Sequence, residues 1–257
     1  MSTLLLLAAL LIVMVAGAVL ISRRLQVDDE FSGGALGATI APCVLALYLV
    51  AAAMGAVIAW ENFTTAEDGI VAEAGAAQSL YWSTTALPEG EAAMVRENLR
   101  AYLTTVVEDD WPRMVAEGEL SAEGDEAMAE LTTSVRTLSA SDSGDGLDRL
   151  TARQELGNLS DARVARSDAA GDGIPTLLLV LTAASGAVVA VMPFAMIKRG
   201  ARVAYLWAAV NLLFVFATIA LLFYIGDPYA SALKADAEGL SAALVTFERV
   251  DSMTVTP

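Results

Sequence analysis

Four long runs without a charged side chain constrain the fold of this chain more than any other feature. They cover residues 3–22, 35–60, 174–197 and 203–225. At 1.5 Å rise per residue, about 20 helical residues cross the roughly 30 Å hydrocarbon core of a bilayer. Helices of soluble proteins seldom stay uncharged over such lengths, so the four runs predict four transmembrane helices.

The first run has an alternative interpretation as a secretory signal peptide, because Ala16-Gly17-Ala18 resembles a cleavage site. However, no Lys or Arg precedes the run, whereas Arg23 and Arg24 follow it. A signal peptide carries its positive charge before a shorter apolar core. We therefore interpret the run as a retained membrane span.

The composition excludes several classes of function. Among 257 residues, 31 are acidic and 15 are basic, so the formal net charge is −16. Nucleic-acid binding needs a basic patch and is not expected. The chain has no histidine, and Cys43 is its only cysteine, which excludes Ser-His-Asp catalysis, His-ligated zinc and an intrachain disulfide. Adjacent carboxylates such as Glu108 and Asp109 face apart on a helix, so we expect no enzyme activity, cofactor or metal.

The basic residues beside the spans predict an orientation. Arg23 and Arg24 follow the first span, and Lys198, Arg199 and Arg202 lie between the third and fourth. With four spans these two loops share one side of the cell membrane, which the positive-inside rule makes cytoplasmic. The protein is then multi-pass, with its N-terminus, its long central segment and its C-terminal tail on the extracytoplasmic side.

The predicted fold class is all-α, with four transmembrane helices in a 2+2 arrangement and a helical extramembrane domain inserted between the second and third. Residues 1–60 hold the first two spans, and residues 173–227 hold the other two. The inserted domain, residues 61–172, carries 23 acidic residues and 8 arginines, which is −15 of the total charge. Residues 228–257 form a tail whose helix is amphipathic.

Apolar residues in the inserted domain recur at helical spacing. One pattern follows Pro88, a second follows Ser121 as a predicted N-cap, and residues 147–167 form a further helix. Residues 61–86 should continue directly from the second span. The predicted core includes Leu99, Tyr102, Trp111, Leu131 and Val135.

The tail from Ala235 to Val250 places Leu240, Leu244 and Phe247 on one helical face. An amphipathic helix of this kind packs on a neighbouring domain or lies on the membrane surface.

The second span contains the candidate pore or gate residues. Pro42 breaks a helical hydrogen bond and lies beside Thr39 and Cys43. A hinge or gate is one interpretation of this group, and a structural kink is the other. In the third span, Pro193 likewise frees a backbone carbonyl that must find a partner.

Small residues at four-residue spacing allow close approach of helices. The candidates for such helix packing are Ala51, Gly55, Ala59, Gly186 and Ala190. Packing within one subunit is one interpretation, and a subunit contact or pore lining is the other. Asn211, the most polar residue of the fourth span, is expected to bond a neighbouring helix.

Two other motifs carry little weight. The acidic turn at residues 142–148 lacks the spacing and the closing Glu of an EF-hand calcium loop. The glycosylation triplets that begin at Asn62 and Asn158 are of a kind that arises by chance.

Seven short motifs occur in an order that resembles the bacterial bestrophin-like domain family, membrane proteins of uncharacterised function. The resemblance covers residues 28–250. In chain order the motifs are Trp60-Glu61-Asn62-Phe63, Val71-x-Glu73-Ala74, Leu80-Tyr81-Trp82, Asp110-Trp111-Pro112, Asn158-Leu159-Ser160-Asp161-Ala162-Arg163, Gly173-Ile174-Pro175 and Asp227-Pro228-Tyr229.

Two positions depart from the family pattern. Asp28-Asp29-Glu30 stands where the family often has a histidine, and Tyr229-Ala230-Ser231 stands where it often has Phe-Ser-Gly.

The resemblance implies kinship with bestrophins, which are pentameric anion channels with two spans, a helical segment and two more spans. In bestrophins the central helical part is cytosolic, whereas the charge rule places it outside here. Tyr48 is the only aromatic residue inside the second span, so the aromatic series of a bestrophin neck is missing.

Two functions remain open at this stage. The first is a homo-oligomeric ion channel with the second span lining the pore, in which the acidic outer domain favours cations. The second is a non-conducting protein of the lipid bilayer, whose outer helical domain binds an envelope protein partner or senses the cell envelope. The second interpretation is supported by the lack of ionisable residues within the spans, because transport paths often carry them.

Overall fold

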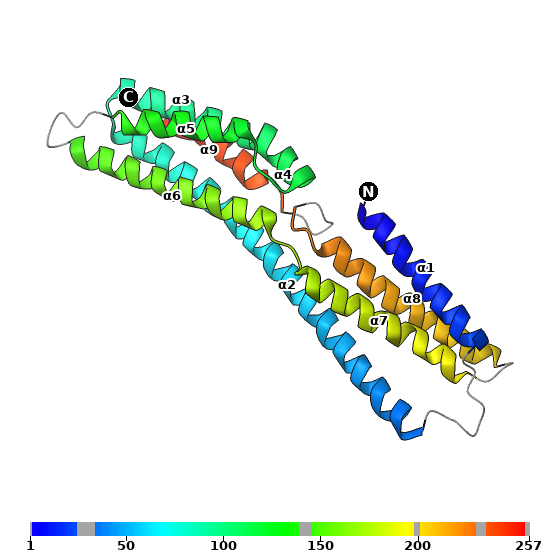
Figure 1. The fold of residues 1–257 in the computed structure, drawn as a ribbon. Coiled ribbons are helices and arrows are strands. Elements are labelled where there is room, and N and C mark those ends of the chain that lie inside the picture. Colours follow the sequence, from blue (N-terminus) through cyan, green and yellow to red (C-terminus); the bar gives the residue numbers. More distant parts are fainter. Residues whose placement is uncertain (1, 25–33, 139–144, 198–200, 230–234, 255–257) are drawn as a thin grey trace. The chain divides into compact units, whose positions relative to one another are not determined.

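The computed structural model describes residues 2–24, 34–138, 145–197, 201–229 and 235–254, and these residues are almost entirely helical (Figure 1). No strand occurs among them. The chain divides into two compact units. Unit 1 comprises residues 1–60 and 173–227, and unit 2 comprises residues 61–172 and 228–257.

Unit 1 contains α1 (Ser2–Arg24), the first part of α2 (Gly34–Ser83), α7 (Thr176–Met196) and α8 (Arg202–Ile225). The chain has four helical regions that are long and apolar enough to cross a membrane, and each of these helices belongs to one of them. α7 and α8 form a closely packed hairpin (Figure 1), and α1 packs against α7.

Few apolar side chains of unit 1 are fully buried within its own core. Within the single chain, 11% of the most apolar stretch of α1 is buried, and 22% of each of the other three stretches is buried. Water would oppose so much apolar exposure, whereas lipid tails or further subunits would cover it.

Unit 2 is built from the rest of α2 and from shorter helices. In chain order these are η2 (Thr84–Ala86), α3 (Glu89–Thr105), a π-helical turn η3 (Val106–Asp110), α4 (Trp111–Glu117), α5 (Ala122–Arg136), α6 (Asp145–Gly171) and α9 (Glu238–Thr254). Residues 61–83 thus continue α2 directly out of unit 1, as the sequence predicted.

Local signals in the sequence explain where the helices of unit 2 begin and end. The Ser121 hydroxyl accepts a hydrogen bond from the Gly124 amide at 2.9 Å, which confirms Ser121 as the N-cap of α5. Gly118 ends α4 with a φ of 72°, a left-handed conformation that glycine adopts without strain. Pro88 is the N-cap of α3 rather than a residue of its first turn.

The predicted core of unit 2 is largely confirmed. Leu99, Tyr102, Leu131 and Val135 are all fully buried. Trp111 was expected among them, but it lies partly buried at the edge of the core, where its ring meets Tyr229 edge-on at 5.6 Å.

The C-terminal helix α9 belongs to the core of unit 2. Leu240 and Phe247 are fully buried, and the Phe247 ring stacks on Tyr81 at 4.1 Å. The Tyr81 hydroxyl donates a 2.6 Å hydrogen bond to Asp251, which also pairs with Arg100. α9 begins at Glu238 rather than Ala235, and its apolar face packs on the central segment instead of on a membrane surface.

Candidate functional site

α2 carries the three residues singled out as a pore or gate. Pro42 lies inside the helix, and both Pro42 and Cys43 are exposed in the single chain. Thr39 belongs to the same helix, but its side chain lies outside the described residues. α2 therefore presents Pro42 and Cys43 away from its neighbours within unit 1.

One face of α2 is exposed along unit 1, and we call its six residues the α2 stripe: Ile40, Cys43, Leu47, Val50, Met54 and Val57. They follow an alternating spacing of three and four residues. Their exposed fractions include 46% at Leu47 and 65% at Val50. A repeat of seven residues keeps one helix face turned toward a partner helix, as in coiled coils.

A second exposed face of α2 has a different character. It includes Leu49, Ala53 and Trp60, and Trp60 is 58% exposed. Tryptophan is enriched where a membrane meets water, so this face is typical of one that contacts lipid.

The third face of α2 is buried and consists of small residues. Ala51 and Ala59 are each only 3% exposed. A Cβ atom at Gly55 would lie 3.4 Å from a methyl group of Leu222 on α8. The missing side chain at Gly55 therefore leaves room for Leu222 of α8 to pack against this face of α2.

Gly186 on α7 lies at a tighter contact. A Cβ atom there would lie 2.9 Å from Ile219 Cδ1 of α8 and 3.0 Å from Tyr48 Cε2 of α2. Ala190, one turn further along α7, is fully buried. Three helices of unit 1 thus meet at Gly186.

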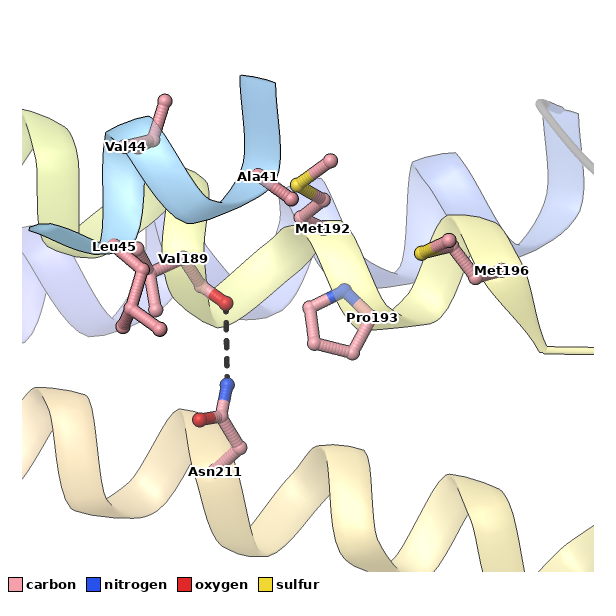
Figure 2. Close-up of a pocket in the computed structure, with 8 residues that line it drawn as sticks. All are labelled: Ala41, Val44, Leu45, Val189, Met192, Pro193, Met196 and Asn211. Atoms are coloured by element: carbon pink, nitrogen blue, oxygen red, sulfur yellow. Dashed lines mark hydrogen bonds between the residues drawn. The ribbon is translucent and has the colours of Figure 1, made fainter. Parts of the chain in front are cut away.

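Pro193 and Asn211 form one local structure in unit 1. Pro193 has no amide hydrogen, so the carbonyl of Val189, four residues earlier in α7, loses its helical partner. Figure 2 shows Asn211 of α8 reaching this carbonyl, to which its Nδ2 donates a 3.1 Å hydrogen bond. Asn211 therefore satisfies the acceptor that Pro193 leaves open.

We expect Asn211→Leu to lower the stability of unit 1 by about 1–2 kcal/mol, because the Val189 carbonyl then has no side-chain donor. Thermal unfolding of the full chain in detergent measures the change. Thr218→Val is the matched control on α8, since the Thr218 hydroxyl bonds only within its own helix, to Phe214. Equal losses in the two variants would contradict this role for Asn211.

Unit 2 contains a buried ion network, which we define as Glu73, Tyr102, Asp110, Arg163 and Arg166. Arg166 is fully buried, and its Nε and Nη2 bond Glu73 at 2.5 and 3.2 Å. Its Nη2 also bonds Asp110 at 3.1 Å. The Tyr102 hydroxyl donates a hydrogen bond to Glu73. Two buried carboxylates, those of Glu73 and Asp110, thus bond the same guanidinium group within the core.

Arg163 completes the balance of charge in this network. Its Nη1 bonds Asp110 at 2.5 Å, and its Nη2 bonds the more exposed Asp125 at 3.0 Å. The guanidinium carbon also lies 5.6 Å from the centre of the Tyr102 ring, within cation–π range.

Asp110 is held by the start of α5 as well as by the arginines. The amide and the hydroxyl of Ser121 donate to Asp110 Oδ1 at 2.8 and 2.6 Å. A Cβ atom at Gly124 would lie 2.7 Å from Asp110 Oδ2, so only glycine fits there. Burial alone would raise the pKa of Asp110, but the hydrogen bonds from Ser121 and Arg163 outweigh it and lower that pKa.

Tyr102 has the opposite shift. Burial first, and then the neighbouring Glu73 carboxylate, raise the pKa of its hydroxyl. The hydroxyl therefore stays protonated and remains a donor to Glu73. All charged members of the network are paired, which is the condition for keeping charges inside a protein core.

The described residues contain no group of three or more Cys, Asp or Glu side chains suited to hold a metal ion. Of the acidic turn at 142–148, residues 142–144 lie outside the described residues.

The buried ion network is a feature that the sequence interpretation missed. Glu108 and Asp109, considered there as paired carboxylates, are exposed, whereas the next residue, Asp110, is fully buried. A signal was present, because Asp110 lies four residues after buried Val106 and eight after buried Tyr102. This spacing places a carboxylate on an apolar helix face.

Comparisons with known proteins place the chain in a class. The family model described as "Bestrophin-like domain" matches residues 5–237. A single-residue variant of a bacterial bestrophin homologue from Klebsiella pneumoniae has a similar solved structure, with a TM-score of 0.69 at 13% sequence identity. The match covers 99% of this chain and 98% of that one. No curated protein matches the chain in sequence.

The chain is therefore an all-helical membrane protein with the fold of a bacterial bestrophin homologue. It belongs to the bestrophin-like domain family. Three members of the buried ion network, Glu73, Asp110 and Arg163, lie within the short motifs that carry the family resemblance.

Proposed function

We propose that the chain is one subunit of a homo-oligomeric ion channel in which the α2 stripe lines the pore. The observation that carries this proposal is the exposure of the stripe along a 50-residue helix. The spacing of three and four residues continues past the stripe to the exposed Glu61, and Asp68 follows seven residues later. One helix face thus runs from apolar to acidic.

An oligomer follows from the geometry of a single chain, because four spans cannot enclose a useful path for ions. Copies of α2 arranged around an axis would turn the α2 stripe inward, and the face with Trp60 would then contact lipid. The family membership and the fold of a bestrophin homologue support the same arrangement.

The charges of unit 2 favour cations at the pore mouth. Six of its arginines, at positions 96, 100, 113, 149, 163 and 166, pair with carboxylates within the unit. The segment 61–172 has 23 acidic residues against 8 arginines, so many acidic side chains have no arginine to neutralise them. This excess raises the local concentration of cations.

We assign unit 1 to the bilayer, with four spans in a 2+2 arrangement, and unit 2 to the extracytoplasmic side. α9 packs with the central segment in unit 2, so the chain must cross the bilayer an even number of times between these two parts. α7 and α8 supply two such crossings. Trp60 and Tyr224 mark one end of unit 1, and Trp207 marks the other. Arg23 and Arg202 lie at the Trp207 end of unit 1 and favour a cytoplasmic location for that end.

Cysteine labelling tests this orientation. In a Cys43→Ala background, Gly157→Cys should react with an impermeant thiol reagent in intact cells, because position 157 is exposed on unit 2 with open space around it. The matched control is Ala201→Cys, exposed at the start of α8, which should react only after lysis. The reverse pattern would place unit 2 in the cytoplasm.

The oligomeric state of the purified protein tests whether several subunits could surround a pore, as the channel proposal requires. The purified chain in mild detergent should have a mass several times that of one 26.8 kDa subunit, measured by light scattering with the detergent subtracted. A monomer that persists after reconstitution into lipid would contradict the proposal.

A groove on unit 2 favours a second candidate function, the binding of a cationic partner. It lies between α3 and α5, has a volume of about 410 Å³ and is lined by Met94, Asn98, Glu126, Glu130 and threonine hydroxyls. Two glutamates one turn apart beside an exposed methionine suit a basic amphipathic segment. Binding of such a partner needs no pore. This proposal would replace the channel proposal if verified oligomers pass no current.

A further inference from the structure

An open cavity of about 360 Å³ lies between α2, α7 and α8 of unit 1 (Figure 2). Val44 and Leu45 line it from α2, and Met192 and Met196 line it from α7. Asn211 is the one polar side chain among the lining residues, and its Nδ2 donates a hydrogen bond to the Val189 carbonyl. A guest in this cavity therefore meets an almost wholly hydrocarbon surface.

The cavity leads toward the end of unit 1 that carries positive charge. Its lining runs along α7 from Val189 to Met196, about two helical turns or roughly 10 Å, and α7 ends there. α8 begins at the same end with Arg202, which is exposed. α1 runs in the same direction as α7 (Figure 1), and Gly17 of α1 faces Val191, so the exposed Arg23, six residues after Gly17, also lies at this end.

We propose that this cavity binds an acyl chain of an anionic phospholipid whose phosphate pairs with Arg202 and Arg23. An apolar slot at the end of unit 1 that also carries two exposed arginines matches a lipid with a hydrocarbon tail and a negative headgroup. The flexible thioethers of Met192 and Met196 adapt to a mobile chain. The inference rests on unit 1 lying in the bilayer and does not depend on ion conduction.

The bound chain would act on α2. Val44 and Leu45 lie next to Cys43 of the α2 stripe, so a tail between them and Met192 supports the first half of this helix against α7. Anionic lipid thereby stabilises the packing of α2 within the subunit.

Thermal unfolding of the purified full chain in detergent tests the proposal, with dioleoylphosphatidylglycerol or dioleoylphosphatidylcholine added at equal mole ratios. The anionic lipid should raise the unfolding temperature by at least about 3 °C more than the zwitterionic one. Arg202→Gln, a surface change, should abolish this difference. Equal shifts for the two lipids on the wild-type chain would overturn the proposal.

A second pair of variants tests the cavity itself. Met192→Trp fills the space between α7 and α2, and it should remove the shift caused by phosphatidylglycerol. Leu213→Trp is the matched control, because Leu213 is 62% exposed on α8 outside the cavity, and it should keep the shift. A retained shift in Met192→Trp would contradict binding in the cavity.

Two further outcomes are decisive. If Met192→Trp instead changes the oligomeric mass, a second copy of the chain occupies the cavity and the lipid proposal is wrong. If Met192→Trp does not fold, native mass spectrometry of the wild-type chain decides. Phosphatidylglycerol should survive delipidation on the wild-type chain and be lost from Arg202→Gln, whereas equal retention contradicts the proposal.

Discussion

Replacing Arg166 with methionine should lower the free energy of unfolding of unit 2 by about 3–5 kcal/mol. Arg166 is fully buried and bonds both Glu73 and Asp110, which are also fully buried. Methionine fills a similar volume but leaves both carboxylates short of a positive partner. An uncompensated charge in a protein core costs far more than the lost hydrogen bonds alone.

Guanidinium-induced unfolding of the full chain in detergent, followed by circular dichroism, measures this loss. Arg113→Met is the matched control, because Arg113 pairs with Glu117 at 3.1 Å while both side chains are about half exposed. A surface pair of this kind contributes about 0.5 kcal/mol or less. A loss below about 1 kcal/mol for Arg166→Met would mean that water reaches the network and that it does not hold unit 2 together.

Cysteines at two adjacent positions of α2 should respond oppositely to a thiol reagent. In the Cys43→Ala background, a water-soluble methanethiosulfonate should block most of the current through Val50→Cys and leave Leu49→Cys unchanged. Val50 belongs to the α2 stripe, whereas Leu49 lies on the face that includes Trp60. Both side chains are more than half exposed in the single chain, at 65% and 55%. Only an aqueous pore on one face would separate them.

Met54→Cys should behave like Val50→Cys, because it lies on the stripe one turn further along. Ala53→Cys should behave like Leu49→Cys. If block instead follows positions 49 and 53, the pore lies on the other face of α2. If neither pair responds, α2 does not line the pathway.

Much of the fold could be predicted from periodicity and from the absence of charge. The four apolar runs correspond to long apolar helices, and the patterns through Leu99 and Leu131 correspond to α3 and α5. These signals are local, since burial repeats every three or four residues along one helix. Ser121 was predictable for the same reason, because a cap depends only on its own helix.

The buried ion network could not be predicted in this way, because its partners come from distant helices. Arg166 and Glu73 are 93 residues apart, and Arg163 and Asp110 are 53 apart. The sequence presents them as members of a strongly acidic, solvated segment. Their buried positions were readable from the helical spacing, but the pairing is set by how α2, η3 and α6 pack.

The interaction between Asn211 and the carbonyl freed by Pro193 could be predicted only in part. The sequence identifies a carbonyl without a helical donor and a polar residue in the next span. Which residue reaches which atom depends on the register of α7 against α8, and the 3.1 Å bond to Val189 defines that register.

Reversal potentials of purified oligomers in liposomes test the channel most directly. With about 0.1 M KCl on one side and about 0.01 M on the other, the current should reverse near the potassium equilibrium potential. The preference should shrink near 1 M salt, because the Debye length falls from about 10 Å at 0.1 M to about 3 Å. Reversal near the chloride potential at low salt would contradict the proposed cation preference, and a verified oligomer without current would favour the binding function of unit 2.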